Sequence, residues 1–417
     1  MSANARQAEQ TLQTMPQPDK AALRQAICSA TTSVLSSTYG DALDAVVLTG
    51  SMARDEATCV RNGESWKILG DAEFLFSFKE NRQGSPIGDL HQIAQKIESA
   101  IQDQRIECSV DLGPVPSNYF SKLPPYIFSF ELKACGKQIF GHTDVLSQIP
   151  NFSAADISRE DAWRLLCNRL LELLEYADDL WALEPVHAER VRYKLVKLYL
   201  DMATTFLIFN GQYAPIYAAR CANLLHLIES GVHPNVPGVD LPGFAKQVSL
   251  CALLKLNPER IGPDAPSLSV REAIRVAHAL WRWELRKLTM LPASASDGEL
   301  MRDFLSQRPT SRRLRGWAFA ARAVGVVQSL RHAPRWLWLA AKGSPRDLIY
   351  LVGTALLFKL EDNPGPVAGL HDSDQASLVR LLPKRDFPEL KSRALGWAGL
   401  ARLVFENYQQ FVLKTRT

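Results

Sequence analysis

The sequence lacks several features that would place it in a protein class at once. Its seven cysteines are scattered without a C-x-x-C pair, so neither a zinc site nor a disulfide framework is indicated. The longest clean apolar run, 348–358, is too short to cross a bilayer as a helix. No fixed-period repeat or low-complexity segment is visible, and residues 1–20 contain no apolar stretch typical of a secretory signal. We therefore expect a cytoplasmic globular protein with free thiols.

The chain also has little net charge, +4 over 417 residues, which argues against a surface that binds nucleic acid along its length. The charge is unevenly distributed, however. Between residues 302 and 346 only one acid, Asp303, is present. The same segment holds ten basic residues: Arg302, Arg308, Arg312, Arg313, Arg315, Arg322, Arg331, Arg335, Lys342 and Arg346.

The chain is longer than one hydrophobic core usually supports, and its pattern changes near residue 150. Before that point helix and strand signals alternate; after it nearly all segments have helical periodicity. We expect an α+β protein: a small mixed-sheet domain over 1–150, a helical domain over 151–262, and a further helical region over 263–417. The expected elements of the first part are helices at 19–37 and 89–102 and strands at 45–49, 71–78, 106–115, 126–134 and 137–141.

Two carboxylates, Asp71 and Glu73, stand at the entrance to an otherwise apolar strand. Side chains alternate along a strand, so these two share one face while Phe74 and Phe76 line the opposite, core face. Carboxylates beside such a run are costly unless something binds them, and their spacing suits the same divalent cations. The alternative is that the two carboxylates have no functional role and simply lie at a solvent-exposed end of the strand.

Gly50 and Ser51 directly follow the preceding strand and could begin a short helix whose backbone N–H groups receive a phosphate. A Gly-Ser pair by itself is most often an ordinary turn. Asp111, in the strand-like segment "CSVDLGPV", supplies the third acid that a two-metal site needs, and Glu131 is the weaker candidate. The order of these features indicates a nucleoside triphosphate site more strongly than any of them alone.

With "LTGSMARDEAT", "GDAEFLF", "VDLGPV" and "FELKACGKQIFG" in this order, the chain resembles the nucleotidyltransferase superfamily of the DNA polymerase beta type. It is most similar to bacterial members with a C-terminal helical domain, such as the antibiotic adenylyltransferases. The segment "YKLVKLYLDMATTFLIFNGQYAPIYAAR" is similar to the first helices of that domain.

The resemblance implies transfer of a nucleoside monophosphate from a triphosphate, with ATP as the expected donor, to a hydroxyl, with release of pyrophosphate. Asp71 and Glu73 would hold two Mg²⁺ ions, and Asp111 would complete the metal site and take the acceptor proton. The phosphates would be bound by Gly50, Ser51, Arg54, Lys194 and Lys197.

Three departures from the family pattern keep a catalytically inactive binding or scaffold protein open as the alternative. Asp55 stands where the family usually has Gly, although Asp tolerates a left-handed backbone better than most residues. The polar stretch "CVRNGESWKIL" lengthens the gap before Asp71. The acid pair is Asp-x-Glu, not Asp-x-Asp.

Two helical segments carry further charge. Arg190, Lys194, Lys197 and Asp201 fall on one helix face, which indicates either a solvated stripe or a triphosphate-binding face. In 312–346, Arg residues alternate with Trp, Phe and Leu. This pattern is consistent with peripheral contact at the inner face of an anionic membrane or with two packed helices whose Trp side chains are buried. The sequence leaves the acceptor and the oligomeric state open.

Overall fold

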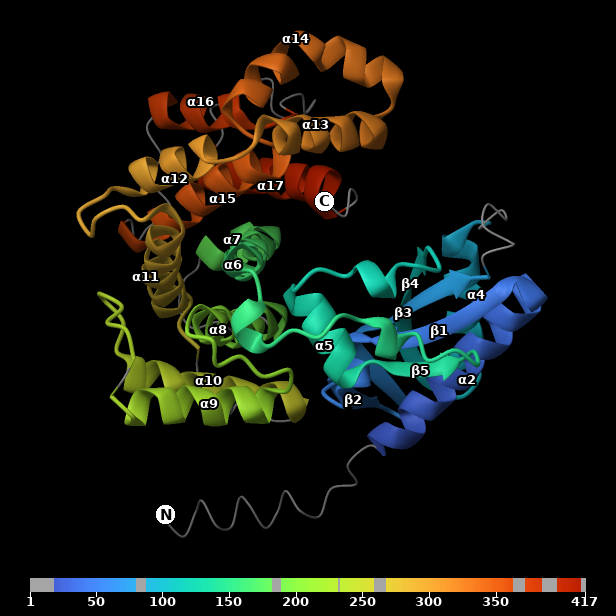
Figure 1. Cartoon of the computed structure of the whole chain (residues 1–417). Coiled ribbons are helices and arrows are strands. Elements are labelled where there is room, and N and C mark those ends of the chain that lie inside the picture. The colour runs from blue at the N-terminus through green and yellow to red at the C-terminus, as the bar shows by residue number, and fades with distance from the viewer. Residues whose placement is uncertain are drawn as a thin grey trace. The chain divides into compact units, whose positions relative to one another are not determined.

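The computed structural model of the chain describes residues 19–79, 88–181, 189–231, 233–258, 268–362, 372–384 and 396–413. The protein has α+β architecture, with a small sheet near the N-terminus followed by many helices (Figure 1). Contacts divide it into two compact units. The first is Met1–Phe152 with Leu256–Glu259, and the second is Ser153–Lys255 with Arg260–Thr417. We call them the sheet unit and the helical unit.

The sheet unit contains five strands in a mixed sheet. Strand β3 is central: it pairs antiparallel with β1 and β2 and parallel with β4, while β5 pairs antiparallel with β1. The strands are β1 Leu43–Thr49, β2 Cys59–Asn62, β3 Ser65–Phe78, β4 Ile106–Val115 and β5 Lys137–Phe140. The helices are α2 Lys20–Tyr39, α3 Gly50–Ala53, α4 Leu90–Gln102 and α5 Ile127–Cys135.

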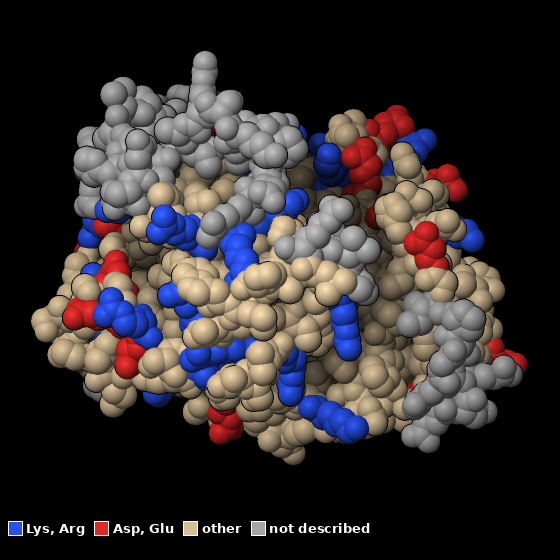
Figure 2. Space-filling view, turned by 90° about the horizontal axis from the view of Figure 1, so that it is seen from above, with Lys and Arg blue, Asp and Glu red and all other residues tan. Residues whose placement is uncertain are grey.

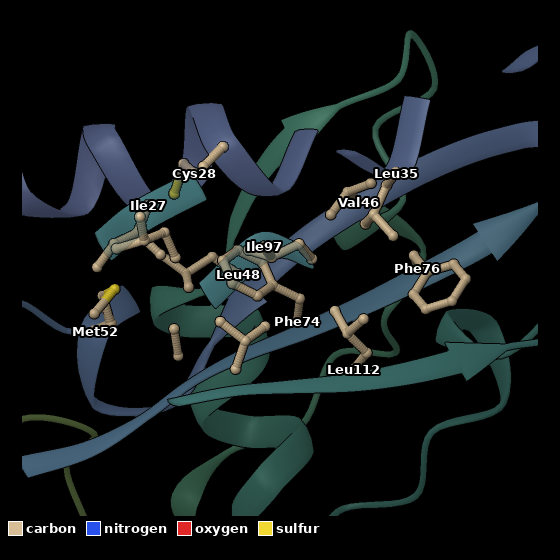
Figure 3. Packing of buried hydrophobic residues seen from close by; sticks show 14 of the residues in the cluster. Ile27, Cys28, Leu35, Val46, Leu48, Met52, Phe74, Phe76, Ile97 and Leu112 are labelled. Carbon is tan, nitrogen blue, oxygen red and sulfur yellow. The ribbon is translucent and has the colours of Figure 1, made fainter. Parts of the chain in front are cut away.

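One face of the sheet packs against α2 and α4. Phe74 and Phe76 of β3 are fully buried there, as the alternation along the strand predicts. They belong to one apolar cluster with Ile27 of α2, Ile97 of α4 and Leu48 of β1 (Figure 3). The opposite face carries a smaller cluster that includes Val47, Leu75 and Leu132 of α5. Both faces of β3 are therefore covered around Leu75, whereas at Asp71 and Glu73 only the face of Ala72 belongs to a cluster.

Two expectations for the sheet unit were wrong. The polar stretch before Asp71 is a hairpin, not a loop: β2 and β3 are joined at Asn62 and Ser65, with Gly63 at φ +62. Glycine is favoured at such a left-handed turn position, so Asn62-Gly63 is a hairpin signal that the interpretation missed. Strand β3 consequently begins at Ser65, six residues before Asp71.

The segment 126–134, expected to be a strand, lies in helix α5. Its alternation of apolar and polar residues favours a strand, but only Ser129 and Leu132, three residues apart, are buried. The Ser129 hydroxyl accepts a hydrogen bond from the Tyr126 backbone N–H (3.0 Å) and donates to the Pro124 carbonyl. This local cap fixes the first turn of the helix and overrides the period-two pattern.

The helical unit consists of packed helices around an aromatic core. Trp163 lies 4.4 Å from Phe304 between ring centroids and also contacts Trp281 and Tyr350. The first helices are α6 Arg159–Leu173, α7 Ala177–Trp181, α8 Glu189–Phe209, α9 Tyr217–Glu229, α10 Leu241–Leu256 and α11 Val270–Thr289. The remaining helices are α12 Asp297–Ser306, α13 Thr310–Val324, α14 Val326–Lys342, α15 Pro345–Asp362, α16 Asp372–Leu381 and α17 Trp397–Tyr408. Of the helices described, none combines the length and the apolar character needed to cross a membrane.

Candidate nucleotide and metal site

The predicted acids form a row across the sheet. Glu73 of β3 is the register partner of Asp111 on the parallel strand β4 and of Thr49, the last residue of β1. Register partners on neighbouring strands project to the same face, and Asp71, two residues before Glu73, shares that face. The fold thus brings Asp71, Glu73 and Asp111 to one face of the sheet, next to the end of β1. They lie within β3 and β4, not at the entrance to a strand as the sequence indicated.

The three carboxylates differ in environment. Asp71 and Asp111 are exposed, whereas Glu73 is largely buried. Burial raises the pKa of Glu73, and the negative charges of Asp111, Asp71 and Glu131 raise it further, while Arg54 opposes the shift. Glu73 is therefore harder to ionise than an ordinary glutamate.

Gly50 brings the backbone directly against Glu73. It begins the short helix α3 and has φ +70, a left-handed value that side-chain-bearing residues rarely adopt. A Cβ placed on Gly50 would lie 2.8 Å from Oε1 of Glu73 and 2.9 Å from its Cδ. Only glycine leaves room for this approach, so the predicted Gly50-Ser51 turn and the acid row are one structural feature. Ser51, the next residue, is partly exposed.

Arg54 follows α3 and is held by two carboxylates. Its Nε lies 3.1 Å from Oε2 of Glu56, and its Nη1 contacts Glu131 of α5. Glu131, the weaker candidate for a metal ligand, is therefore an ion-pair partner of Arg54. The pair links the end of α3 to α5 and positions the guanidinium that was predicted to bind phosphate.

Asp55 adopts φ +61, the left-handed conformation for which the family pattern has glycine. Its carboxylate pairs with Arg24 of α2 and with Lys137 of β5, the latter at 3.5 Å. The turn after α3 is thus retained despite the substitution, since Asp tolerates this conformation and two cations hold its side chain. Asp55 by itself therefore does not indicate an inactive site.

The donor chemistry of the acid row suits Mg²⁺, which takes carboxylate oxygens. In the part of the chain that the structure describes, no three His, Cys, Asp or Glu side chains stand close enough together to hold a metal ion. Asp71, Glu73 and Asp111 therefore fit such an ion by residue type and by strand position, but their side chains do not form a metal cage.

The predicted phosphate ligands of the helical unit, Lys194 and Lys197, belong to a charged cluster between α6 and α8. Lys194 lies 3.3 Å from Glu172 and 3.4 Å from Glu175. Arg169, in turn, is 2.6 Å from both Glu172 and Asp201. The face 190–201 is therefore not a simple solvated stripe, because Asp201 is buried and paired with the neighbouring helix.

Lys197 is the member of this cluster whose pKa shift disfavours its charged form. The positive charge of Arg169, together with burial, lowers its pKa to about 8, although Glu172 acts in the opposite direction. Arg169, Glu172 and Lys255 were not predicted. Arg169 and Glu172 lie three residues apart on one helix face, a spacing that favours an ion pair and could have identified these two residues. No such signal marks Lys255 of α10, whose charge also lowers the pKa of Lys197.

The basic segment does not present its tryptophans as one exposed stripe. Trp317 and Trp336 are buried, with ring centroids 5.2 Å apart, whereas Trp338 is exposed. Arg313 donates to the Leu305 and Ala341 carbonyls, and Arg335 to the Pro383 carbonyl. Two of the three Trp side chains thus belong to the core, as the packed-helix interpretation expects.

No protein-family model, curated protein or solved structure matches this chain.

Proposed function

We propose that the protein is a metal-dependent nucleotidyltransferase that transfers a nucleoside monophosphate from a nucleoside triphosphate to a hydroxyl group and releases pyrophosphate. One observation carries the proposal: Glu73 and Asp111 are register partners on parallel strands, and the Gly50 backbone lies against the Glu73 carboxylate. A glycine turn next to a row of acids on one sheet face is the combination that this chemistry requires.

Each residue then has a defined task. Asp71, Glu73 and Asp111 would hold Mg²⁺, which neutralises charge on the reacting phosphates when bound. The exposed Asp111 accepts the proton of the acceptor hydroxyl. Gly50 and Ser51 bind the triphosphate through backbone N–H groups and the Ser51 hydroxyl. Arg54, fixed by Glu131, adds positive charge next to them.

Lys194 and Lys197 are the proposed pyrophosphate ligands from the helical unit. The lowered pKa of Lys197 supports this role, since a cation held close to Arg169 gains from an added anion. ATP is the expected donor, and a small hydroxyl compound or a protein side chain the expected acceptor. The protein is proposed to act in the cytoplasm.

A second candidate is an inactive protein of the same fold that binds a nucleotide or serves as a scaffold. The observation favouring it is that the acids of the described chain do not form a ready cage for a cation. The two candidates differ in one measurable respect: only the enzyme releases pyrophosphate.

The test uses the full chain with each α-³²P-labelled triphosphate, Mg²⁺ and a cell extract, followed by identification of the labelled product. We expect label transfer by the wild type and none by Asp71→Asn, which removes one charge and almost no volume. Asp103→Asn, at an exposed acid after α4, is the matched control and should retain full transfer. The inactive binding protein would be favoured by a different result: the wild type transfers no label, yet a triphosphate with Mg²⁺ raises its melting temperature, and Asp71→Asn loses this stabilisation. Stabilisation that Asp71→Asn leaves unchanged would show that the acids are structural.

A further inference from the structure

A hollow of about 170 Å³ in the helical unit is lined by four arginines. Arg164 reaches it from α6, Arg312 and Arg315 from α13, and Arg346 from the start of α15. Phe319 and Phe411 complete its apolar part. Lys and Arg side chains gather over the helical unit on the side shown in Figure 2, where few Asp or Glu side chains are visible.

Two arginines of this hollow share one carboxylate with the nearby Arg308. Glu160 lies 2.7 Å from Arg164 and 2.8 Å from Arg312, and it also contacts Arg308. These three guanidinium groups lower the pKa of Glu160 even though burial acts to raise it. One negative charge cannot neutralise three positive ones, so the Glu160 contacts leave positive charge uncompensated.

Arg346, like Arg315, takes no part in the ion pairs with Glu160. Its side chain is partly buried, and burial is the main cause that lowers its pKa. Its Nε has no hydrogen-bond partner, and no ion pair to it is found within the described residues. The adjacent acid, Asp347, accepts a hydrogen bond from the Ser344 hydroxyl at 2.7 Å. A buried guanidinium with unused donors is costly unless an anion occupies the hollow.

The local charges can be counted. Five arginines, at 164, 308, 312, 315 and 346, face two carboxylates, Glu160 and Asp347, which leaves an excess of three positive charges. Guanidinium groups match the oxygens of phosphate in fork geometry and remain charged at all working pH values. The volume corresponds to roughly five or six waters at about 30 Å³ each, enough for a phosphoryl group and a few further atoms.

We propose that this hollow is a binding site for a phosphoryl group on a small molecule, separate from the candidate nucleotide site. Arg346 and Arg315 supply the free donors, and Arg164 and Arg312 hold the anion while remaining paired with Glu160. Phe319 and Phe411 contact the apolar atoms next to the phosphoryl group. A soluble phosphate ester and a phospholipid headgroup share this chemistry, and the experiment separates them.

The test is calorimetric titration of the full chain with inorganic phosphate and with glycerol 3-phosphate, in EDTA so that no divalent cation contributes. We expect saturable binding by the wild type and an affinity at least tenfold weaker in Arg346→Gln. Arg302→Gln, which removes the same charge at an exposed position of α12, should bind as the wild type does. Sedimentation with vesicles containing phosphatidic acid, against vesicles of phosphatidylcholine, is the second arm.

Each outcome decides the matter. Loss of phosphate binding in Arg346→Gln supports a soluble ester, and loss of vesicle sedimentation alone supports a headgroup at the same site. Should Arg346→Gln fold poorly, Arg315→Gln takes its place, because Arg315 is exposed and contributes no paired interaction among the described residues. Absence of binding in both arms overturns the proposal. The proposal is also overturned if phosphate binding persists in Arg346→Gln and Arg315→Gln but is lost in Lys197→Gln. The anion would then bind at the α6–α8 cluster.

Discussion

Charged side chains are arranged differently in the acid row of the sheet unit and in the cluster between α6 and α8. In the acid row, Glu73 is surrounded by three further carboxylates and is opposed chiefly by Arg54. In the cluster, acids and bases alternate, and Arg169 pairs with both Glu172 and Asp201. Paired opposite charges favour the charged form of each member, whereas neighbouring like charges disfavour it.

Each region nevertheless contains one group whose pKa shift favours its uncharged form. The pKa of Glu73 is raised and that of Lys197 is lowered, whereas the shifts of Arg169 and Glu172 favour their charged forms. A cation bound near Glu73 would reverse the first shift, and an anion bound near Lys197 would reverse the second. The following variants test this comparison.

The largest effect on transfer activity is expected for Glu73→Gln. This change keeps the volume and removes a carboxylate that is proposed to bind Mg²⁺, so transfer should fall at least about 10²-fold. Without metal, the variant should be no less stable than the wild type, because it removes a buried charge from among like charges. Label transfer and thermal unfolding in EDTA measure the two effects. A variant that unfolds more easily in EDTA and keeps its transfer rate would contradict the comparison.

Glu284→Gln tests the effect of burial alone on the pKa of a glutamate. Glu284 is fully buried on α11, and no like charge contributes to the shift of its pKa. Burial raises its pKa to about 8. Thr205 contacts both Glu284 and the Met202 carbonyl, and its single proton can serve both bonds only if Glu284 is protonated.

The folded state therefore holds a proton that the unfolded chain releases near pH 4.5, and stability falls as pH rises from about 4.5 to 8. Glu284→Gln should change stability little at pH 4.5 and raise it by several kcal/mol, up to about 5, at pH 8.5, since each unit of the pKa shift corresponds to about 1.4 kcal/mol. Urea unfolding at the two pH values measures this difference. An equal effect at both would show that Glu284 titrates normally.

Gly50→Ala tests the contact between the turn and the acid row. The left-handed φ and the collision with Glu73 together should cost about 2–3 kcal/mol. Gly63→Ala is the matched control: Gly63 has φ +62, yet no atom lies within 4 Å of its added Cβ. It should cost only about 1 kcal/mol. Equal losses in both variants, measured by urea unfolding, would mean that Glu73 moves aside freely.

Sequence patterns predicted the parts of the fold in which period and burial agree. The strand at Phe74 and Phe76 and the helix over 90–102 are of this kind. Helix α5 was missed because a cap at Ser129 outweighed an alternating pattern, and the hairpin because Asn62-Gly63 was not weighed as a turn. Such local hydrogen bonds and backbone angles leave little trace in periodicity.

The candidate site divides in the same way. Asp71, Glu73 and Asp111 could be placed on one face from strand alternation and order along the chain, and the register agrees. The pairing of Arg54 with Glu131 could not be predicted, since the two lie 77 residues apart and on different elements. Arg169 was missed for the same reason: its partner Asp201 lies on another helix, 32 residues away.

Lys197→Met concerns the unfavourable contacts of Lys197 with the like charges of Arg169 and Lys255. The pKa of Lys197 is lowered to about 8 from an ordinary value near 10.5, so the unfolded chain holds the proton more strongly between these two pH values. The wild type should therefore gain stability as pH rises from about 8 to 10.5, and below pH 8 the charged ammonium costs the folded state its full penalty. Methionine keeps the apolar stem without the charge, so the variant should be more stable at pH 7, by up to about 3 kcal/mol, and no more stable at pH 10.5. A saturating triphosphate with Mg²⁺ should stabilise the wild type more than the variant, because the phosphate restores a partner to the ammonium. Lys246→Met, at an exposed position of α10, is the control and should behave as the wild type in all three measurements. A Lys197→Met protein that is less stable at pH 7 and equally stabilised by the triphosphate would show that Lys197 serves the ion pairs of the helices alone.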